Sequence, residues 1–372
     1  MSQRENVNPI REQNHRKNSR RYQKRAAVRR RRNTIFIMEI VLLLILAVVL
    51  FFVSKLSKIE KTKLDMDKIE VNEDISQESR KIMKGYQTIA MFGLDNRSNG
   101  NLSQGRSDVI MLANINNDTK EVKLVSVYRD TYLDTGDGIF QKCNAAYAKG
   151  GPEQAISMLN VNLDLNITDY VTVDFNSIIE CVDLLGGVDM EITDDEASLM
   201  TGYIRELNEL TGNKAENLTQ GGTYTLNGVQ ACAYARIRYG GGDDYRRTER
   251  QRTVLTAMVK KAQQSDLTTV NKLINEVCGD IQTSFSNAEL LALASQVFQY
   301  SIGDTTGFPF TKTTRVLSKK TGDVVIPCDL SDNVKELHIF LYEDSAYTAS
   351  DTVKQNSEKI VSDTGFKSGD GH

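Results

Sequence analysis

The residues best suited to chemistry lie in one dense segment, residues 235–252, with the sequence ARIRYGGGDDYRRTERQR. The segment holds six arginines and no lysine: Arg236, Arg238, Arg246, Arg247, Arg250 and Arg252. Because the planar guanidinium binds phosphate or carboxylate through two parallel hydrogen bonds, arginines without lysines indicate recognition of an anion. A solvated charged loop is the alternative that composition alone leaves open.

The spacing of these arginines predicts two groups that converge. Arg236 and Arg238 are two residues apart, so in an extended segment their side chains face the same way. Arg247 shares a helix face with Arg250 and Gln251, three and four residues further on. Residues 240–242 are three glycines, which let the chain turn between the groups. A helix N-terminus beside them would favour an anion further.

A second set of charged residues stands at the ends of predicted strands in the N-terminal half. The set comprises Asp95, Arg97, Arg106, Asp108, Arg129 and Asp130. Strand ends at one sheet edge are where α/β proteins build sites. Asp95 and Asp108, together with phosphate oxygens and water, would suit Mg²⁺, although an aspartate pair can also be structural.

Several familiar catalytic patterns are absent from the sequence. It contains no GxxxxGK[ST], GxSxG, HExxH or SxxK motif. The three histidines are His15, His338 and His372, and we expect His338 within a strand. These positions argue against a histidine-based triad. Within the arginine segment, Asp244 would orient one arginine or accept a proton.

The pattern of apolar residues predicts an α/β fold with a mixed central sheet covered by helices on both faces. Predicted strands include YQTIAMFGLD, SDVIMLANIN, EVKLVSVYRD, DYVTVDF, VDMEI, TTRVLS, TGDVVIP and LHIFLY. Predicted helices include GGPEQAISMLNVNL, NSIIECVDLLGG, LNGVQACAYA and TERQRTVLTAMVKKAQQ. The helix SIIECVDLL and residues 171–175 are candidate walls of an apolar groove, and ordinary core is the alternative for both.

Residues 34–53 read TIFIMEIVLLLILAVVLFFV, and Glu39 is their one ionisable residue. Twenty residues give about 30 Å of helix, enough to cross a bilayer. Residues 1–33 carry twelve Lys or Arg against two acidic residues. The positive-inside rule therefore predicts a cytoplasmic N-terminus and an external C-terminal portion. This basic leader lacks a recognition fold, so we expect no nucleic-acid partner.

Seven collinear motifs resemble the LytR–CpsA–Psr family of cell-wall glycopolymer transferases. They are D-x-R at 95, GRSD at 105–108, VSVYRDT at 125–131, NAAYAKGGPE at 144–153, VDLLGGV at 182–188, LNGVQACAYARIR at 226–238 and RRTERQ at 246–251. The resemblance spans roughly residues 84–262. The predicted cytoplasmic tail and single membrane span also resemble the organisation of this family.

The resemblance implies an activity found in the walls of Gram-positive bacteria. A glycopolymer, teichoic acid or capsular polysaccharide, would pass from a polyprenyl-pyrophosphate carrier in the plasma membrane to a peptidoglycan hydroxyl. Asp95 and Asp108 would hold Mg²⁺. The pyrophosphate and head group would be bound by Arg97, Arg106, Arg129, Arg236, Arg238, Arg247, Arg250 and Gln251. Arg129 and Arg236 would also be catalytic, together with Asp244 or Asp130.

At two pairs of neighbouring residues the resemblance leaves two candidates open. Arg246 stands where many members have a small residue, so either Arg246 or Arg247 could enter the site, and Asp243 competes with Asp244. The alternative functions are a non-catalytic binder or regulator of wall glycan or lipid phosphate, and a polyprenyl-pyrophosphate hydrolase.

The expected organisation has six parts. They are a basic cytoplasmic tail at 1–33, a transmembrane helix at 34–53, an extracellular stalk at 54–82, the catalytic domain at 83–264, a C-terminal extension packed on it at 265–350, and a terminal helix with a loose tail at 351–372.

Overall fold

The structure is a computed structural model. It describes residues 60–61, 64–94, 102, 105–238, 244–266, 269, 272–273 and 281–371. Contacts divide the chain into Met1–Lys55 and Leu56–His372, and all described residues belong to the second unit. No helix within the described ranges is long and apolar enough to cross a bilayer, and the predicted span at 34–53 lies outside them.

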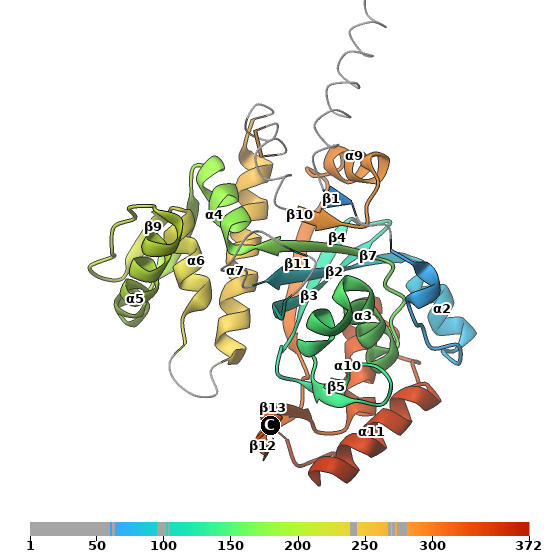
Figure 1. The fold of residues 1–372 in the computed structure, drawn as a ribbon. Coiled ribbons are helices and arrows are strands. Elements are labelled where there is room, and N and C mark those ends of the chain that lie inside the picture. The colour runs from blue at the N-terminus through green and yellow to red at the C-terminus, as the bar shows by residue number, and fades with distance from the viewer. Residues whose placement is uncertain are drawn as a thin grey trace, which may run out of the picture. The chain divides into compact units, whose positions relative to one another are not determined.

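A seven-stranded mixed sheet forms the centre of this unit (Figure 1), in the order β1-β10-β7-β2-β3-β4-β11. The strands are β1 (Glu60–Lys61), β2 (Tyr86–Leu94), β3 (Ser107–Asn116), β4 (Glu121–Val127), β7 (Asp169–Asp174), β10 (Ile281–Thr283) and β11 (Ser301–Phe308). β2, β3 and β4 are antiparallel neighbours, whereas β7 runs parallel to β2 and β11 parallel to β4. The predicted mixed sheet is confirmed.

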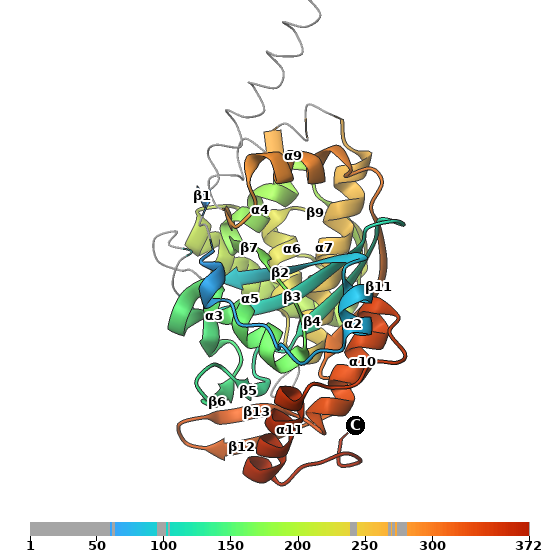
Figure 2. The same cartoon turned by 90° about the vertical axis from the view of Figure 1, so that its right-hand side faces the viewer.

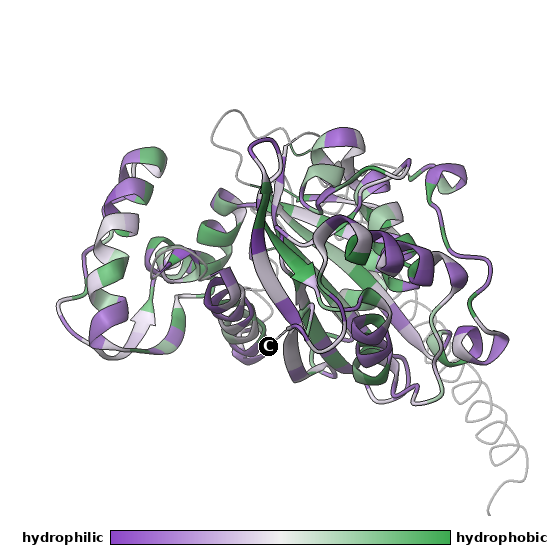
Figure 3. Cartoon of the chain, turned by 90° about the horizontal axis from the view of Figure 1, so that it is seen from below, coloured by the Kyte–Doolittle hydropathy of each residue, from purple (hydrophilic) through white to green (hydrophobic). Residues whose placement is uncertain are grey.

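Alternation along the strands explains why helices cover both faces. Ala90 and Phe92 face a core that includes residues of α3 (Ala145–Leu163), α10 (Leu330–Tyr342) and α11 (Asp351–Thr364). Ile89 and Met111 face the other side, where α7 (Asp244–Gln264) and α9 (Asn287–Ser295) contribute leucines. Because successive strand residues point to opposite faces, β2, β3 and β4 contribute side chains to both cores. Figures 2 and 3 show the helices on both sides of the sheet.

A second layer stands beyond α7 and has its own core. It comprises α4 (Phe175–Leu184), β8 (Val188–Ile192), α5 (Asp194–Thr211), β9 (Gly222–Leu226) and α6 (Gly228–Arg236). α6 packs closely on α4 at Gly228, where an added Cβ would lie 2.2 Å from the Ile179 carbonyl oxygen. Glycine therefore brings together the two helices that carry Phe175 and Arg236.

The C-terminal residues are more integrated than an added extension. Two strands of the central sheet come after residue 264: β10, which lies between β1 and β7, and β11, which forms one edge. β12 (Lys312–Ser318) and β13 (Gly322–Pro327) form a separate hairpin, like β5 (Tyr132–Asp134) with β6 (Phe140–Lys142).

The prediction that LHIFLY is a strand was wrong, because these residues end helix α10. The Asp329 side chain caps that helix by accepting from the backbone N–H groups of Ser331 and Asp332. Its buried residues Val334, Leu337 and Leu341 repeat with helical spacing. A short apolar run cannot be assigned by periodicity alone, and the cap decides it. His338 is therefore a buried helical residue whose Nε2 lies 3.0 Å from the Leu163 carbonyl.

The segment predicted as a stalk packs on the domain from residue 64 onward. Ile69 and Ile75 are buried in the main core, before the short helix α2 (Gln77–Met83). The Asn72 amide donates to Asp164 at 2.5 Å and to the Val161 carbonyl at 2.9 Å. The folded unit thus begins about twenty residues before the predicted boundary at 83.

Candidate active site

A polar cavity of about 300 Å³ lies at the edge of the sheet where β3 begins and β4 ends. Four arginines and one carboxylate supply its charged lining, and the full set is Asp108, Val109, Arg129, Phe175, Tyr203, Arg236, Arg238, Arg247 and Gln251. These residues come from β3, the turn after β4, and helices α4, α5, α6 and α7. Arginines outnumber carboxylates at the lining, so the cavity suits an anion.

Two helix ends bring the arginines together. α6 begins with a capping box in which Asn227 and Gln230 bond reciprocally, and it ends at Arg236. Ile237 then takes an extended conformation, which also leaves Arg238 at the cavity. α7 begins at Asp244, so Arg247 lies in its first turn and Gln251 one turn later on the same face. A helix end, instead of the predicted extended segment, carries Arg236.

Asp244 links three of the arginines. Its Oδ1 lies 2.6 Å from Arg247 Nη2, 3.8 Å from Arg238 Nη2 and 3.9 Å from Arg129 Nε. Arg129 Nη1 also donates to Asp108 Oδ1 at 2.7 Å. Asp244 is not among the lining residues of the cavity, and its carboxylate contacts arginines that are.

Arg236 is held from three directions. Its Nη2 donates to Glu206 Oε1 at 3.2 Å. Its guanidinium carbon lies 5.3 Å from the centre of the Phe175 ring and 5.6 Å from that of Tyr203. Cation–π contact and a charge-assisted hydrogen bond together fix a side chain that would otherwise be flexible.

Several buried polar atoms around the cavity have no hydrogen-bond partner among the described residues. They are Nε of Arg129, Nε of Arg247, Oδ2 of Asp244 and Oε1 of Gln251. Buried polar groups in native proteins normally have partners, and exceptions need an explanation. Other unpartnered buried atoms lie elsewhere in the described fold, but those beside the cavity are placed where a bound ligand could supply the missing bonds.

Burial and charge shift two pKa values in this group. Burial raises the pKa of Asp244, although the positive charges of Arg129 and Arg238 oppose the shift. Burial lowers the pKa of Arg129, but the Asp108, Asp244 and Asp130 carboxylates outweigh it, so the net pKa is raised. Arg129 stays charged, whereas Asp244 titrates above the ordinary aspartate range.

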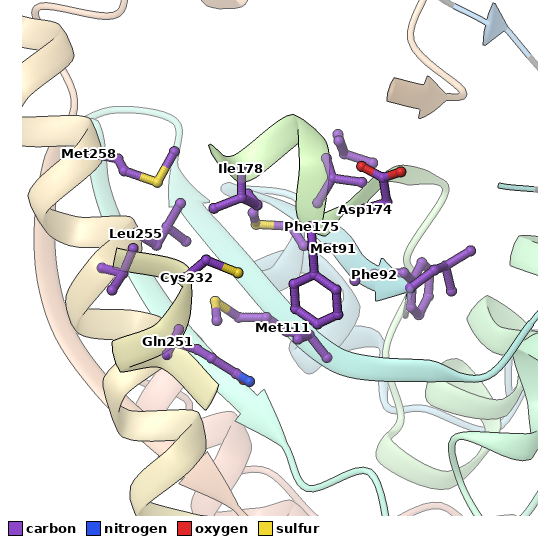
Figure 4. A pocket seen from close by; sticks show the side chains of 17 residues that line it. Met91, Phe92, Met111, Asp174, Phe175, Ile178, Cys232, Gln251, Leu255 and Met258 are labelled. Carbon is purple, nitrogen blue, oxygen red and sulfur yellow. The ribbon is translucent and has the colours of Figure 1, made fainter. Parts of the chain in front are cut away.

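An apolar cavity of about 120 Å³ adjoins the polar one (Figure 4). It lies between β2, β3 and β7 on one side and α4, α6 and α7 on the other. Val109, Phe175 and Gln251 line both cavities. Figure 4 shows Gln251, Leu255 and Met258 in succession along α7, with Phe175 and Ile178 facing them from α4. A charged compartment therefore opens beside an apolar one.

A family model identifies this domain. The model of the LytR_cpsA_psr family matches residues 46–315. The chain belongs to the LytR_cpsA_psr family.

Two relatives carry transferase names. TagU of Enterococcus faecalis, named a polyisoprenyl-teichoic acid–peptidoglycan teichoic acid transferase, is 30% identical over 210 residues, which are 56% of this chain and 64% of that protein. TagV of Bacillus subtilis, named for the same activity, is 30% identical over 195 residues, 51% of this chain and 48% of that protein. The match thus spans about half to two thirds of the relatives' length.

A solved structure of TagT bound to LIIa-WTA has the same fold. Its TM-score is 0.55 and its identity 21%, over 71% of this chain and 92% of that one. At this identity the likeness supports the LytR_cpsA_psr fold alone.

The structure brings six of the twelve predicted site residues to the polar cavity. Arg129, Arg236, Arg238, Arg247, Gln251 and Asp108 line the polar cavity. Arg246 is exposed, so Arg247 is the arginine of that pair that enters the site. Asp95, Arg97 and Asp243 lie outside the described residues.

Four predicted residues in the described part of the chain lie away from the lining, and Asp244, which contacts the lining arginines, is one of them. Arg250 turns toward α5, where its Nε lies 3.1 Å from Glu196 Oε1. Arg106 is exposed and is not among the lining residues. Asp130, the residue after Arg129, pairs with Lys142 instead, and its Oδ1 lies 3.0 Å from Lys142 Nζ.

Tyr203 and Glu206 were missed by the sequence analysis, whereas Phe175 was predicted in the wall of an apolar groove, which it does line, but not beside Arg236. All three contact Arg236, from helices α4 and α5. Phe175 directly follows the strand DYVTVD, and its position at a strand end was a usable signal. Tyr203 and Glu206 lie within an amphipathic helix, where no sequence signal separates them from surface residues.

Proposed function

We propose that this protein transfers a glycopolymer, such as teichoic acid or capsular polysaccharide, from a polyprenyl-pyrophosphate carrier to a peptidoglycan hydroxyl. The observation that carries the proposal is the junction of an arginine-lined cavity with an apolar one. The charge of a pyrophosphate suits the first cavity, and the apolar start of a polyprenyl chain suits the second. The transferase names of the relatives favour the same reaction.

The reaction balances as a phosphoryl transfer. The peptidoglycan hydroxyl oxygen attacks the phosphorus that bears the glycan, the bridging P–O bond breaks, and polyprenyl phosphate leaves. A glycan–phosphate–peptidoglycan diester forms, and the hydroxyl proton is released. Such transfer needs positioning and charge neutralisation more than a protein nucleophile.

The described residues divide these tasks. Arg129, Arg236, Arg238 and Arg247 bind the pyrophosphate oxygens and neutralise the charge that develops on the leaving phosphate. Asp244 holds the arginines in place, since neither it nor Asp130 lines the cavity. Its role in this proposal is therefore positioning, and proton removal by a protein carboxylate is not required for the loose transition state.

The donor set also fits Mg²⁺. The Asp108 carboxylate lines the cavity and its side chain is 27% exposed, so an oxygen can face a ligand while another accepts from Arg129. No group of three or more metal-binding side chains occurs within the described part of the chain. Mg²⁺ binds through one or two carboxylates plus substrate phosphates, and Asp108 with Asp95 would supply them. When bound, the ion would neutralise pyrophosphate charge.

The proposal includes the membrane. Residues 34–53 anchor the chain in the plasma membrane of a Gram-positive bacterium, with the N-terminus cytoplasmic and the folded unit outside. Membrane lipid is thus a partner, and the carrier reaches the apolar cavity from the same bilayer.

The test is a transfer assay with the full chain in lipid nanodiscs. A labelled polyprenyl-pyrophosphate glycan and purified peptidoglycan are supplied with and without EDTA. We expect wall-linked label and polyprenyl phosphate in equal amounts, only when peptidoglycan and Mg²⁺ are both present. Binding of the donor with no release would show a non-catalytic binder. Release without peptidoglycan would show a hydrolase, and either result overturns the proposal.

A further inference from the structure

Helix α5 contributes the Glu206 carboxylate to a site in which arginines outnumber carboxylates. Glu206 Oε1 accepts from Arg236 Nη2 at 3.2 Å, while Tyr203, almost one turn earlier, lines the polar cavity. The Arg236 side chain is 14% exposed and that of Glu206 37% exposed. The pair thus stands between the cavity wall and solvent.

The charge of Glu206 requires an explanation. A carboxylate bound to a lining arginine repels a phosphate that binds the same arginine, because like charges this close interact unfavourably. An arginine has five N–H donors in a rigid fork, so one carboxylate leaves others for a ligand. A net benefit can come from orientation, since a guanidinium already in place loses less rotamer freedom on binding.

The geometry around Arg236 is that of an oriented guanidinium. The Phe175 and Tyr203 rings lie 5.3 and 5.6 Å from the guanidinium carbon. Glu206 adds the directional hydrogen bond that ring contacts lack. Without this hydrogen bond, the two ring contacts alone do not determine which N–H groups of Arg236 face the cavity.

The helix that carries Glu206 is itself tied to the site. α5 begins with a capping box in which Thr193 and Glu196 bond reciprocally. The other Glu196 oxygen, Oε1, lies 3.1 Å from Arg250 Nε on α7, and these side chains are 12% and 8% exposed. α7 also supplies Arg247 and Gln251 to the cavity. The Glu196–Arg250 pair therefore links α5 to α7, and both helices supply lining residues to the cavity.

From these contacts we infer that Glu206 is a positioning residue, which orients Arg236 toward the bound pyrophosphate, and that the Arg250–Glu196 pair anchors the helix that presents it. The inference rests on the proposed function for its substrate. It assigns α5, which no sequence motif marks, to the catalytic arrangement.

The decisive variants are Glu206→Ala and Glu206→Gln, with Glu209→Ala as the matched control. Glu209 is exposed on the same helix and lines neither cavity. We expect Glu206→Ala to lower kcat/KM of transfer roughly tenfold, the effect of one charge-assisted hydrogen bond. Glu206→Gln still accepts from Arg236 and keeps most of the activity, and Glu209→Ala keeps all of it.

A combined variant separates positioning from general loss of structure. Arg236→Ala already removes the group that Glu206 orients, so Glu206→Ala should have little further effect in that background. Multiplicative losses in the double variant, or full activity in Glu206→Ala, overturn the inference.

Inorganic pyrophosphate binding to the full chain gives a readout independent of turnover. Positioning predicts weaker binding in Glu206→Ala, whereas simple charge repulsion predicts tighter binding. Tighter binding would overturn the inference while leaving the transfer proposal intact. Conversely, absence of transfer by the wild-type chain would overturn the proposed function, and weaker pyrophosphate binding in Glu206→Ala would still support orientation of Arg236.

Discussion

The two adjoining cavities differ in almost every physical property, although they share three residues. One is about 300 Å³ and has four arginines in its lining, and the other is about 120 Å³ and lined mainly by methionine and branched aliphatic side chains. Val109, Phe175 and Gln251 belong to both. A ligand that satisfies both has a polyanionic head joined directly to an apolar chain.

The difference follows from where each cavity lies on the fold. The apolar cavity lies between a sheet face and the helices packed on it, and most of its lining residues are apolar. The polar cavity lies at the strand ends, where the sheet stops and helix termini bring in charge. A single sheet thus provides both environments within one residue of each other along β3, at Asp108 and Val109.

The largest expected effect is on the polar side. Arg247→Ala should lower kcat of transfer by about 10²–10³, the loss seen when one preorganised charge-stabilising donor is removed. Arg246→Ala, an exposed position on the same helix turn, should leave kcat within twofold of wild type. Equal losses in the two variants would place the effect in α7 stability and not in the cavity, which circular dichroism would check.

The next effect is on the apolar side. Ile178→Asp places a carboxylate in the apolar cavity from a half-buried position, so it should raise KM for a long polyprenyl donor roughly tenfold or more. A donor with one or two isoprene units should lose far less, because it has little chain to place there. If both donors lose equally, the apolar cavity does not receive the lipid.

The pH dependence sharpens the comparison further. Ionised Asp244 holds three arginines, and burial raises its pKa, so transfer should fall as pH drops through a range above that of an ordinary aspartate. Protonation then removes the carboxylate charge that orients the arginines. Asp244→Asn should remove the fall in kcat/KM at low pH and leave a low activity that does not change over this pH range. An unchanged acid limb in Asp244→Asn would assign it to another group.

The raised pKa of Asp244 has the opposite effect on the free energy of unfolding, which falls as the pH rises. A buried carboxyl with a raised pKa contributes stability below its unfolded pKa and loses it as pH rises through the folded pKa. Asp244→Asn should therefore lose less stability than wild type over that rise, measurable by denaturant unfolding at two pH values.

The smallest effect on activity is expected far from both cavities. The Tyr347 hydroxyl donates to the buried Asp164 carboxylate, which also accepts from the Ser350 N–H at 2.8 Å. Tyr347→Phe should lower the free energy of unfolding by about 2 kcal/mol, the value of a hydrogen bond to a charged group. Transfer at 25 °C should not change. A parallel loss of kcat would show that the C-terminal helices are coupled to the site.

Residue type predicted the anion site better than residue spacing did. Arginine without lysine located the segment that supplies three of the four lining arginines. The predicted helix-face grouping holds for Arg247 with Gln251 but not for Arg250, because Glu196 draws Arg250 to α5. Sequence spacing cannot report a partner more than fifty residues away along the chain.

The fold shows the same limit. The mixed sheet and its flanking helices follow from alternation and helical periodicity, and both were predicted. The apolar run in α10 fits a strand as well as a helix until Asp329 is seen to cap it. Tyr203 and Glu206 become site residues only because Gly228 lets α6 pack on α4, while α5 packs in the same core.

The central claim is that one lipid-linked pyrophosphate occupies both cavities. Its most direct test is mass spectrometry of lipid that copurifies with the full chain from its own membrane, compared among wild type, Arg247→Ala and Ile178→Asp. We expect a polyprenyl phosphate or pyrophosphate with the wild-type chain, and strongly reduced amounts with each variant. A wild-type chain that carries no isoprenoid, or variants that retain it at the wild-type level, would contradict the account.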